Sequence, residues 1–359
     1  MLLQSPAHRR RSRVLFVCKR RRGYWGPGEH YAGDLSSGLS NSVSFLVDML
    51  AGIGVAAKAV EVVDNNSIGR EVSAYRATHA IIEALWVVPA KFEVLTKLHP
   101  RVQWIVRNHS EAPFLSNEGI ATSWIASYLQ RGIEVMCNSM AAQAQLKAMA
   151  ADFGSAEALV THGPNFYPFP GQEAVTPRLP VMKGELHIGC FGAMRPLKNH
   201  LAQAIAAISF ANAQGRKLRF YVNAGRIEGG ASPVLRNLHD LFSGSAGSRH
   251  LLVERDWLPH QQFLVSLGAT TDIAMQVSFS ETFNIVSADS AAVGLPVAGS
   301  TAIPWLGAYA WTSPSDIGQM ESALNAVWNV DLRQRLASQS NDLRAWSTAS
   351  QSAWSSRFQ

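Results

Sequence analysis

The chain has 359 residues, a hydrophobic fraction of 47% and a formal net charge of +6 at neutral pH. This length and composition predict two domains with large packed cores and exclude a disordered chain. No run of about 18 apolar residues occurs, and the basic N-terminus lacks the apolar segment of a secretory signal, so we expect neither a membrane span nor secretion. The basic charge suits nucleic acid, an anionic surface or a phosphorylated small molecule as a partner.

The cysteines indicate a reducing compartment. Cys18, Cys137 and Cys190 each lie in an apolar run, and none pair at the spacing of metal ligands. They predict buried reduced thiols in a cytoplasmic protein. The sequence holds no Asp-x-Asp motif and no His/Cys cluster with zinc spacing, so we expect that no metal or other cofactor is required.

Apolar runs alternate with helical spacing along residues 1–163. The runs that predict buried strands are Val14–Cys18, Val55–Val63, Ala80–Trp86, Val102–Val106, Ile133–Cys137 and Leu159–Thr161. Helical spacing occurs at Val43–Leu50, Phe92–Leu98 and Ala141–Ala151. This alternation predicts an α/β domain with a parallel, doubly wound sheet.

A proline-rich segment, residues 164–185, predicts an extended linker, and a second α/β domain is expected at residues 186–340. Its predicted strands are Leu186–Phe191, Leu218–Asn223, His250–Glu254 and Asp272–Gln276. Its predicted helices are His200–Asn212, Leu235–Phe242, Gln261–Leu267 and Ser315–Leu336. A last helix, within residues 341–359, is expected to pack back on the first domain.

The stretch Ser278–Ser300 carries the strongest functional signal. Glu281 follows an apolar strand and is expected to open a helix, and Asp289 lies a little over two helical turns later, near the same face. The amides of the residues after Glu281 would then be free for an anion; they belong to Thr282, Phe283 and Asn284. Two carboxylates beside an anion site predict a ligand with sugar hydroxyls and phosphates.

The loop Gly192–Asn199 is a second candidate, because ligands of parallel sheets bind beyond the carboxyl ends of the strands. It begins with Gly192 and carries Arg195 and Lys198 next to a predicted helix start, which suits a diphosphate. A surface turn with two solvated bases is the alternative interpretation. By the same rule, residues 19–38, 107–111, 138–139 and 278–284 are expected around one cleft, and Trp257 is expected to shape a pocket for a nucleotide base.

These motifs resemble the second domain of retaining glycosyltransferases of the GT-B fold. The resemblance rests on Gly192-x-x-Arg195-x-x-Lys198-Asn199, on Glu281-x7-Asp289 and on Gly294-Leu295-Pro296-Val297. It implies two Rossmann-like domains that face a central cleft, a UDP-sugar donor and transfer with retention at the anomeric carbon.

The resemblance also implies roles for single residues. Arg195 and Lys198 would bind the diphosphate, and Glu281 would hold the sugar hydroxyls. Asp289 stands where a glutamate is usual and would hold the ribose. His109 matches the histidine that such enzymes place beside the donor sugar, so Glu281 and His109 are the expected catalytic residues.

The first half is similar to glycosyltransferases encoded by tailed bacteriophages. The similarity lies in Ser36–Ser42, Val62–Asn66, Ile82–Trp86 and Arg107–Ser110. Phage enzymes of this kind often decorate hydroxymethylated bases of viral DNA. The similarity therefore implies 5-hydroxymethylcytosine in duplex DNA as the acceptor, and the host cytoplasm as the location.

A basic and aromatic loop agrees with a DNA acceptor. Its residues are Lys19, Arg20, Arg21, Arg22, Gly23, Tyr24, Trp25, Gly26 and Gly28. The bases could contact DNA phosphates while the two aromatic rings stack on an extruded base, and the glycines allow close approach to a phosphate. Alternatively, the bases bind the donor diphosphate and the two rings are packing anchors. The sequence leaves both interpretations open.

Other roles and functions also remain open. Glu83, Glu111 and Asp34 are candidate bases for activating an acceptor hydroxyl. Three alternative functions fit the same fold: transfer to a glycan or lipid, epimerisation of a sugar nucleotide, and DNA binding without catalysis.

Overall fold

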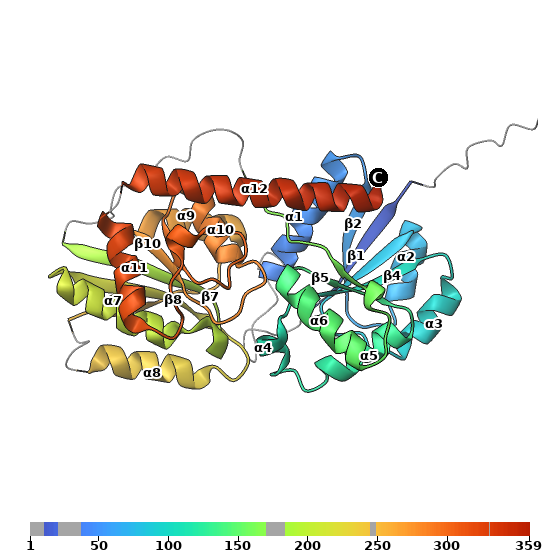
Figure 1. Ribbon diagram of the computed structural model, residues 1–359, viewed down its shortest axis with the longest axis horizontal. Coiled ribbons are helices and arrows are strands. Elements are labelled where there is room, and N and C mark those ends of the chain that lie inside the picture. Colours follow the sequence, from blue (N-terminus) through green and yellow to red (C-terminus); the bar gives the residue numbers. More distant parts are fainter. Residues whose placement is uncertain (1–10, 21–36, 170–183, 245–248, 330) are drawn as a thin grey trace, which may run out of the picture.

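The computed structural model describes residues 11–20, 37–169, 184–244, 249–329 and 331–359. Figure 1 shows two α/β units side by side, each built on a parallel sheet flanked by helices. The predicted α/β class with two parallel sheets is thereby confirmed. No helix in the described ranges is long and apolar enough to cross a membrane.

The first sheet has the strand order β2-β1-β3-β4-β5-β6, and every paired strand is parallel. Its strands are β1 (Arg13–Lys19), β2 (Ala56–Val62), β3 (His79–Glu83), β4 (Gln103–Asn108), β5 (Glu134–Cys137) and β6 (Val160–His162). Its helices are α1 (Gly38–Gly52), α2 (Ile68–Tyr75), α3 (Lys91–Leu98), α4 (Ala112–Leu115), α5 (Ala121–Gln130) and α6 (Met140–Asp152). Since β1 pairs with both β2 and β3, the winding reverses at β1, where open sheets hold their ligands.

The second sheet has the order β11-β10-β7-β8-β9 and is also parallel. Its strands are β7 (Glu185–Met194), β8 (Lys217–Ile227), β9 (Leu251–Glu254), β10 (Ile273–Gln276) and β11 (Val297–Gly299). Its helices are α7 (His200–Ala213), α8 (Ser232–Ser243), α9 (His260–Thr270), α10 (Ile285–Ala292) and α11 (Ile317–Asn329).

Strand β7 continues three residues beyond the predicted end at Phe191. The register with β8 shifts after Cys190, and Gly192 has a φ of 108°, which only glycine adopts without strain. The Gly192 amide donates to the side chain of Asn223 at 2.9 Å. The predicted loop therefore starts as a bulged strand end that is fixed to its neighbour.

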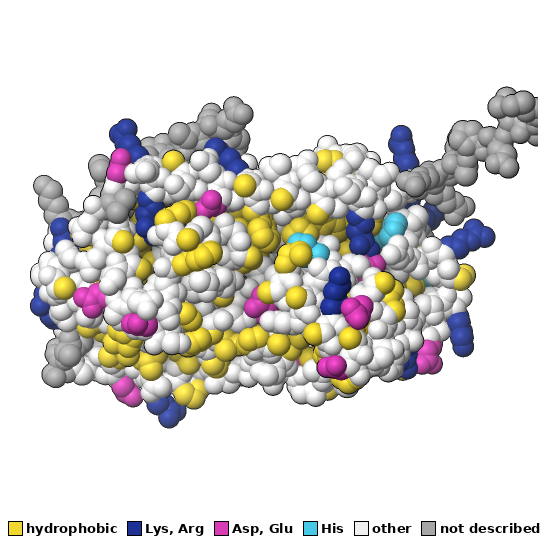
Figure 2. Space-filling model, in the orientation of Figure 1, with side chains coloured by type: hydrophobic (Ala, Val, Ile, Leu, Met, Phe, Trp, Pro, Cys, Tyr) yellow, Lys and Arg dark blue, Asp and Glu magenta, His cyan; other side chains and the backbone are white. Residues whose placement is uncertain are grey.

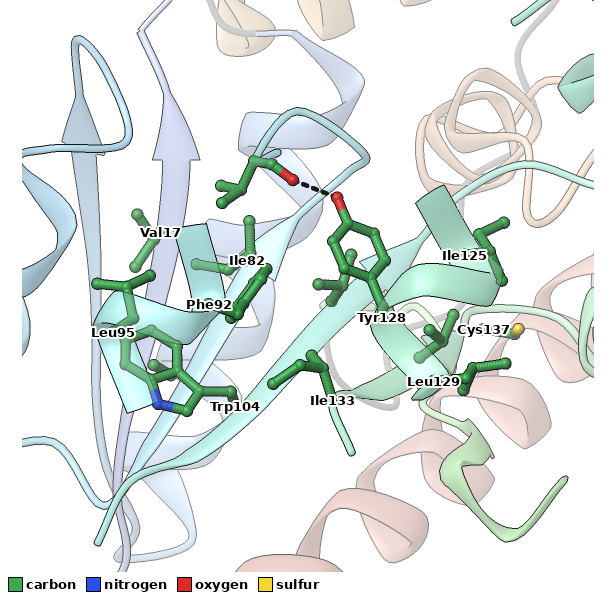
Figure 3. Packing of buried hydrophobic residues seen from close by; sticks show 14 of the residues in the cluster. Val17, Ile82, Phe92, Leu95, Trp104, Ile125, Tyr128, Leu129, Ile133 and Cys137 are labelled. Carbon is green, nitrogen blue, oxygen red and sulfur yellow. Dashed lines mark hydrogen bonds between the residues drawn. The ribbon is translucent and has the colours of Figure 1, made fainter. Parts of the chain in front are cut away.

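The first domain packs its core on both faces of the sheet. Figure 3 shows part of one face, where Phe92 lies against Trp104 and Tyr128 with ring centroids 5.8 and 5.5 Å apart. The buried Tyr128 hydroxyl donates to the carbonyl of Val87, the dashed line in Figure 3. A buried phenol needs such a partner, because an unpaired one would cost stability.

The two C-terminal helices divide at a different place from the prediction. Helix α11 ends at Asn329, and α12 (Leu332–Phe358) runs without a break through residues 337–340. The Asp331 carboxylate caps α12 by accepting from the amide of Arg333 at 2.9 Å. Polar residues inside α12 are buried and hydrogen-bonded, which stabilises the helix there. The side chain of Gln339, for example, accepts from the amide of Val297 and donates to the carbonyl of Leu295.

The last turns of α12 lie on the first domain (Figure 1). The Trp354 ring stacks on Phe358 with centroids 5.8 Å apart, and its indole nitrogen donates to the carbonyl of Pro164 at 2.8 Å. A side chain on Gly163 would collide with Met136 and approach Trp354, so this contact also requires the glycine. Arg357 forms an ion pair with Glu134 of β5 at 2.5 Å.

We expect Trp354→Ala to lower the free energy of unfolding by about 3–5 kcal/mol, since it removes a large buried ring and leaves a cavity. Urea unfolding followed by circular dichroism measures the loss. The matched control is Gln351→Ala, at an exposed position of the same helix. Equal stabilities of the two variants would contradict a structural role for this contact.

Candidate active site

A cavity of about 500 Å³ lies between the two domains, at the carboxyl ends of strands from both sheets. The predicted site residues that line it are His109, Gly192, Arg195, Lys198, Glu281, Thr282, Phe283, Asn284 and Asp289. Residues from the two halves of the sequence therefore share one cavity.

The predicted start of the helix after Glu281 is wrong. Helix α10 begins at Ile285, and Asn284 is its N-cap, with a φ of 60° and a side chain that accepts from the Ser287 amide at 2.9 Å. Asparagine tolerates this left-handed conformation and caps well, which explains the late start. The amide end of the helix is thus at Ile285 and Val286, which also line the cavity.

Glu281 and Asp289 consequently do not share a helix face. Glu281 lies in the turn before α10, where one carboxylate oxygen accepts from Asn284 at 3.0 Å and from Lys198 at 2.5 Å. Both acids nevertheless line the same cavity.

The predicted phosphate cations already have carboxylate partners. Arg195 is paired with Glu228, and its guanidinium lies 5.0 Å from the ring centroid of Phe114, which belongs to the other domain. Lys198 is paired with Glu281, and Arg226 donates to Glu228 at 2.6 Å. Burial raises the pKa of Glu228, but the two arginines outweigh burial and hold this pKa below its usual value.

The loop that carries Arg195 and Lys198 is held by Asn199. Asn199 has a φ of 60°, and its side-chain amide donates to the carbonyl of Pro314 at 2.7 Å and to that of Val277 at 3.3 Å. These bonds tie the loop to the segments that follow β10 and precede α11. Both cations are therefore presented from a fixed backbone.

His109 is held by a fully buried carboxylate. Its Nε2 lies 2.6 Å from Glu83, which also faces the buried guanidinium of Arg107 at 3.4 Å. Since a carboxylate accepts, Nε2 carries the proton, and Nδ1 accepts from Asn138 at 3.2 Å. Burial lowers the pKa of His109 more than Glu83 raises it.

Neither Glu83 nor Glu111 is among the residues that line the cavity. Glu83 faces the interior of the first domain. Glu111 accepts hydrogen bonds from Ser139 and Ser280, each at 3.1 Å, and so bridges the two domains. In the structure Glu83 is hydrogen-bonded to His109, and Glu111 connects the two domains; that either acid acts as a base stays a prediction.

Thr282 forms a second bridge between the domains. Its hydroxyl donates to the carbonyl of His109 at 3.1 Å and accepts from Asn138 at 3.0 Å. Together with the Glu111 bonds, this contact fixes the turn before α10 against the ends of β4 and β5.

Asp289 is 2% exposed, and one of its oxygens accepts from two side chains. Tyr167 and His260 each donate to Oδ1 at 2.8 Å. Burial raises the pKa of Asp289 despite these donors. Tyr167, His260 and Glu228 belong to no motif that the sequence shows, because they are far in the chain from the residues that they contact.

The basic and aromatic loop falls largely outside the described residues, which exclude Arg21, Arg22, Tyr24, Trp25, Gly26, Gly28 and Asp34. Arg20 is described; it lies 3.6 Å from Glu61 and does not line the cavity. Within the described ranges, no group of three His, Cys, Asp or Glu side chains is placed to hold a metal ion.

Neither a protein-family model nor a curated protein sequence matches the chain. Solved structures match over nearly its whole length. The UDP-forming trehalose-phosphate synthase of Burkholderia vietnamiensis is 12% identical, with a TM-score of 0.66 over 98% of this chain and 97% of that one. The E. coli trehalose-6-phosphate structure bound with UDP-2-fluoro glucose is 9% identical, with a TM-score of 0.66 over 97% and 99%.

The sucrose-phosphate synthase of Thermosynechococcus elongatus is 13% identical, with a TM-score of 0.65 over 96% of this chain and 98% of that one. At sequence identities this low, the structural similarity establishes the fold alone. The chain therefore has the GT-B fold expected from its motifs, with two Rossmann-like domains.

A buried histidine beside the cation loop predicts a pH dependence of stability. His200 is 1% exposed, and neither ring nitrogen has a hydrogen-bond partner among the described residues. Burial and the nearby Lys198 lower its pKa to about 3. A histidine in the unfolded chain has a pKa of about 6.5. Below that pH the unfolded state binds a proton that the folded state does not bind, so stability falls as the pH falls.

Between pH 6.5 and 4.5 the wild-type chain should therefore lose about 2 kcal/mol of stability that His200→Leu does not lose. Urea unfolding at both pH values checks this difference. Gln351→Leu, at an exposed position without a titratable group, serves as the control and should keep the wild-type slope. A His200→Leu slope equal to that of the wild type would contradict the assignment.

Proposed function

We propose that the chain is a retaining glycosyltransferase that moves a sugar from a UDP-sugar to a hydroxyl acceptor. The observation that carries this proposal is the shared cavity, which joins Arg195, Lys198 and Glu281 of one domain to His109 of the other. Cations, a sugar-facing carboxylate and an aromatic residue, Trp257, line one space, and these are the groups that a nucleotide sugar needs.

The diphosphate would bind between Arg195 and Lys198. Each cation would exchange its present carboxylate, Glu228 or Glu281, for a phosphate oxygen. The amide end of α10 lies on the same cavity and favours negative charge. As the bond to the sugar breaks, these fixed groups stabilise the charge on the leaving diphosphate.

The donor sugar would lie between Glu281 and His109. Glu281, released from Lys198, can accept from sugar hydroxyls. Because Glu83 fixes the proton of His109 on Nε2, the ring offers Nδ1 as an acceptor, and a sugar hydroxyl can replace Asn138 there. Catalysis then rests on placing the donor, with both domains contributing contacts.

The nucleoside would extend towards Trp257 and Asp289. Trp257 lines the cavity, and the guanidinium of Arg226 lies 4.7 Å from its ring centroid, which gives an aromatic surface suited to a base. Asp289 and His260 line the same cavity, and the ribose would lie next to them. Two neighbours support the choice of donor, since one is UDP-forming and the other holds UDP-2-fluoro glucose.

The acceptor would bind on the first-domain side of the cavity. On that side, the described lining includes the hydroxyl and amide groups of Ser37, Asn41, Ser110 and Asn117 and the carboxylate of Glu118, and it contains no Lys or Arg. Figure 2 shows Lys and Arg side chains scattered among acidic ones on the face in view. This lining suits the hydroxyls of a small acceptor.

Two acceptors are therefore tested side by side. 5-Hydroxymethylcytosine in duplex DNA is supported by the sequence of residues 19–28 and by the resemblance to phage enzymes. A sugar phosphate is supported by the neighbours, which include synthases of trehalose phosphate and sucrose phosphate. Assignment to a phage, and to its host cytoplasm, stays a prediction.

The test incubates the protein with UDP-glucose and one acceptor at a time, glucose 6-phosphate or hydroxymethylcytosine DNA, and measures UDP release and product mass. We expect UDP release that depends on one acceptor. Conversion of UDP-glucose without an acceptor would identify an epimerase instead. DNA binding without binding of any sugar nucleotide would identify a non-catalytic module. Activity only on a glycan or a lipid would show that neither of the two tested compounds is the acceptor.

For the donor site, we expect Lys198→Ala and Arg195→Ala each to weaken UDP binding about 10- to 100-fold, the effect of losing a charge-assisted hydrogen bond. Lys198→Ala also leaves Glu281 without its cation, and Arg195→Ala leaves Glu228 with Arg226 as its cation, so in each variant a less neutralised carboxylate repels the phosphates. Calorimetric titration with UDP measures the affinity. Arg236→Ala, an exposed arginine of α8, is the control and should bind as the wild type does; an unchanged affinity in Lys198→Ala would remove that residue from the site.

A further inference from the structure

Two side chains at the nucleoside end of the cavity differ in what they can offer a ligand. The side chain of Asp289 is 3% exposed and that of His260 is 14% exposed, and both line the cavity. Oδ1 of Asp289 already accepts from the Tyr167 hydroxyl and from Nε2 of His260. The carboxylate thus lies behind the imidazole.

The bond to Asp289 fixes the state of the His260 ring. A carboxylate accepts only, so Nε2 of His260 carries the proton, and Nδ1 is left with a free lone pair. Among the described residues nothing is hydrogen-bonded to Nδ1. The ring cannot turn easily, because Phe45 packs against it with centroids 5.6 Å apart and Tyr167 supports Phe45 at 5.4 Å.

The position of this pair along the cavity indicates its ligand group. His260 follows Trp257 by three residues, and the paired cations Arg195 and Lys198 lie on the same cavity. In a nucleoside diphosphate the ribose connects the base to the phosphates. If the base lies at Trp257 and the phosphates at the cations, as the proposed function requires, ribose hydroxyls come next to His260.

We infer that Nδ1 of His260 accepts a hydrogen bond from a ribose hydroxyl and that Asp289 acts as a positioning residue for His260. This inference rests on the proposed function, and it replaces one expectation from the sequence: the ribose is recognised by the imidazole of His260 rather than directly by the buried carboxylate of Asp289. His260 then determines the preference for ribose over deoxyribose in the donor.

The experiment compares binding of UDP, 2′-deoxy-UDP and 3′-deoxy-UDP by calorimetry. The wild-type chain should bind UDP about tenfold more tightly than at least one deoxy compound, the effect of one hydrogen bond with a well-placed partner. His260→Ala should lose this preference and bind UDP as weakly as that deoxy compound. Because each variant is compared with itself on two ligands, a change in overall stability does not imitate the result.

Asp289→Asn and Tyr167→Phe test whether Asp289 acts through the hydrogen bond that it accepts from His260 or through its negative charge. The amide oxygen that Asp289→Asn introduces can still accept from His260, so this variant should keep the preference although the negative charge is gone. Tyr167→Phe removes the other donor to Oδ1 of Asp289 and should also keep the preference for UDP over the deoxy compound.

Each contrary outcome is decisive. If His260→Ala keeps the preference, or if Asp289→Asn loses as much as His260→Ala, the carboxylate itself contacts the ribose and the inference is wrong. Equal wild-type affinity for all three nucleotides also overturns it while leaving the donor site intact. A wild-type chain that binds none of them overturns the proposed function together with the inference.

Discussion

The buried guanidinium of Arg107 holds together the parts on which the cavity depends. It has no exposed surface, and it bonds to Glu83, to the carbonyl of Gly163 and to Asn165 at 2.5 Å. A buried charge without partners costs several kcal/mol, so these contacts must form together. Arg107 thereby fixes the end of the first domain, the segment leaving it, and, through Glu83, the orientation of His109.

The charges inside the cavity are also paired, since each described cation that lines it has an acidic partner. Glu228 serves Arg195 and Arg226, and Glu281 serves Lys198. Without a ligand this pairing lowers the cost of holding three cations close together in a partly buried space. It also makes binding an exchange of anions, so affinity depends on how well phosphate competes with a carboxylate.

The sequence predicted those features that depend on local pattern. Apolar runs located nearly all strands, and the loops at their carboxyl ends located the cavity lining, because a parallel sheet brings those ends together. Predictions from local pattern failed where a backbone conformation or a partner distant in the sequence determines the structure. The start of α10 depends on Asn284 in a left-handed conformation, and the continuity of α12 depends on Gln339 bonding a distant strand. The roles proposed for the cavity residues stay predictions.

The path of α12 has a mechanical consequence. Its first half packs in the second domain through Leu343, and its end packs in the first through Trp354. At 1.5 Å per residue, its 27 residues form a rod of roughly 40 Å laid across both bodies. The segment that leaves the first domain bonds to this same helix, since Trp354 donates to the carbonyl of Pro164 and Ser350 to that of Asn165. Any separation of the two domains must therefore bend α12 or break its contacts with one of them.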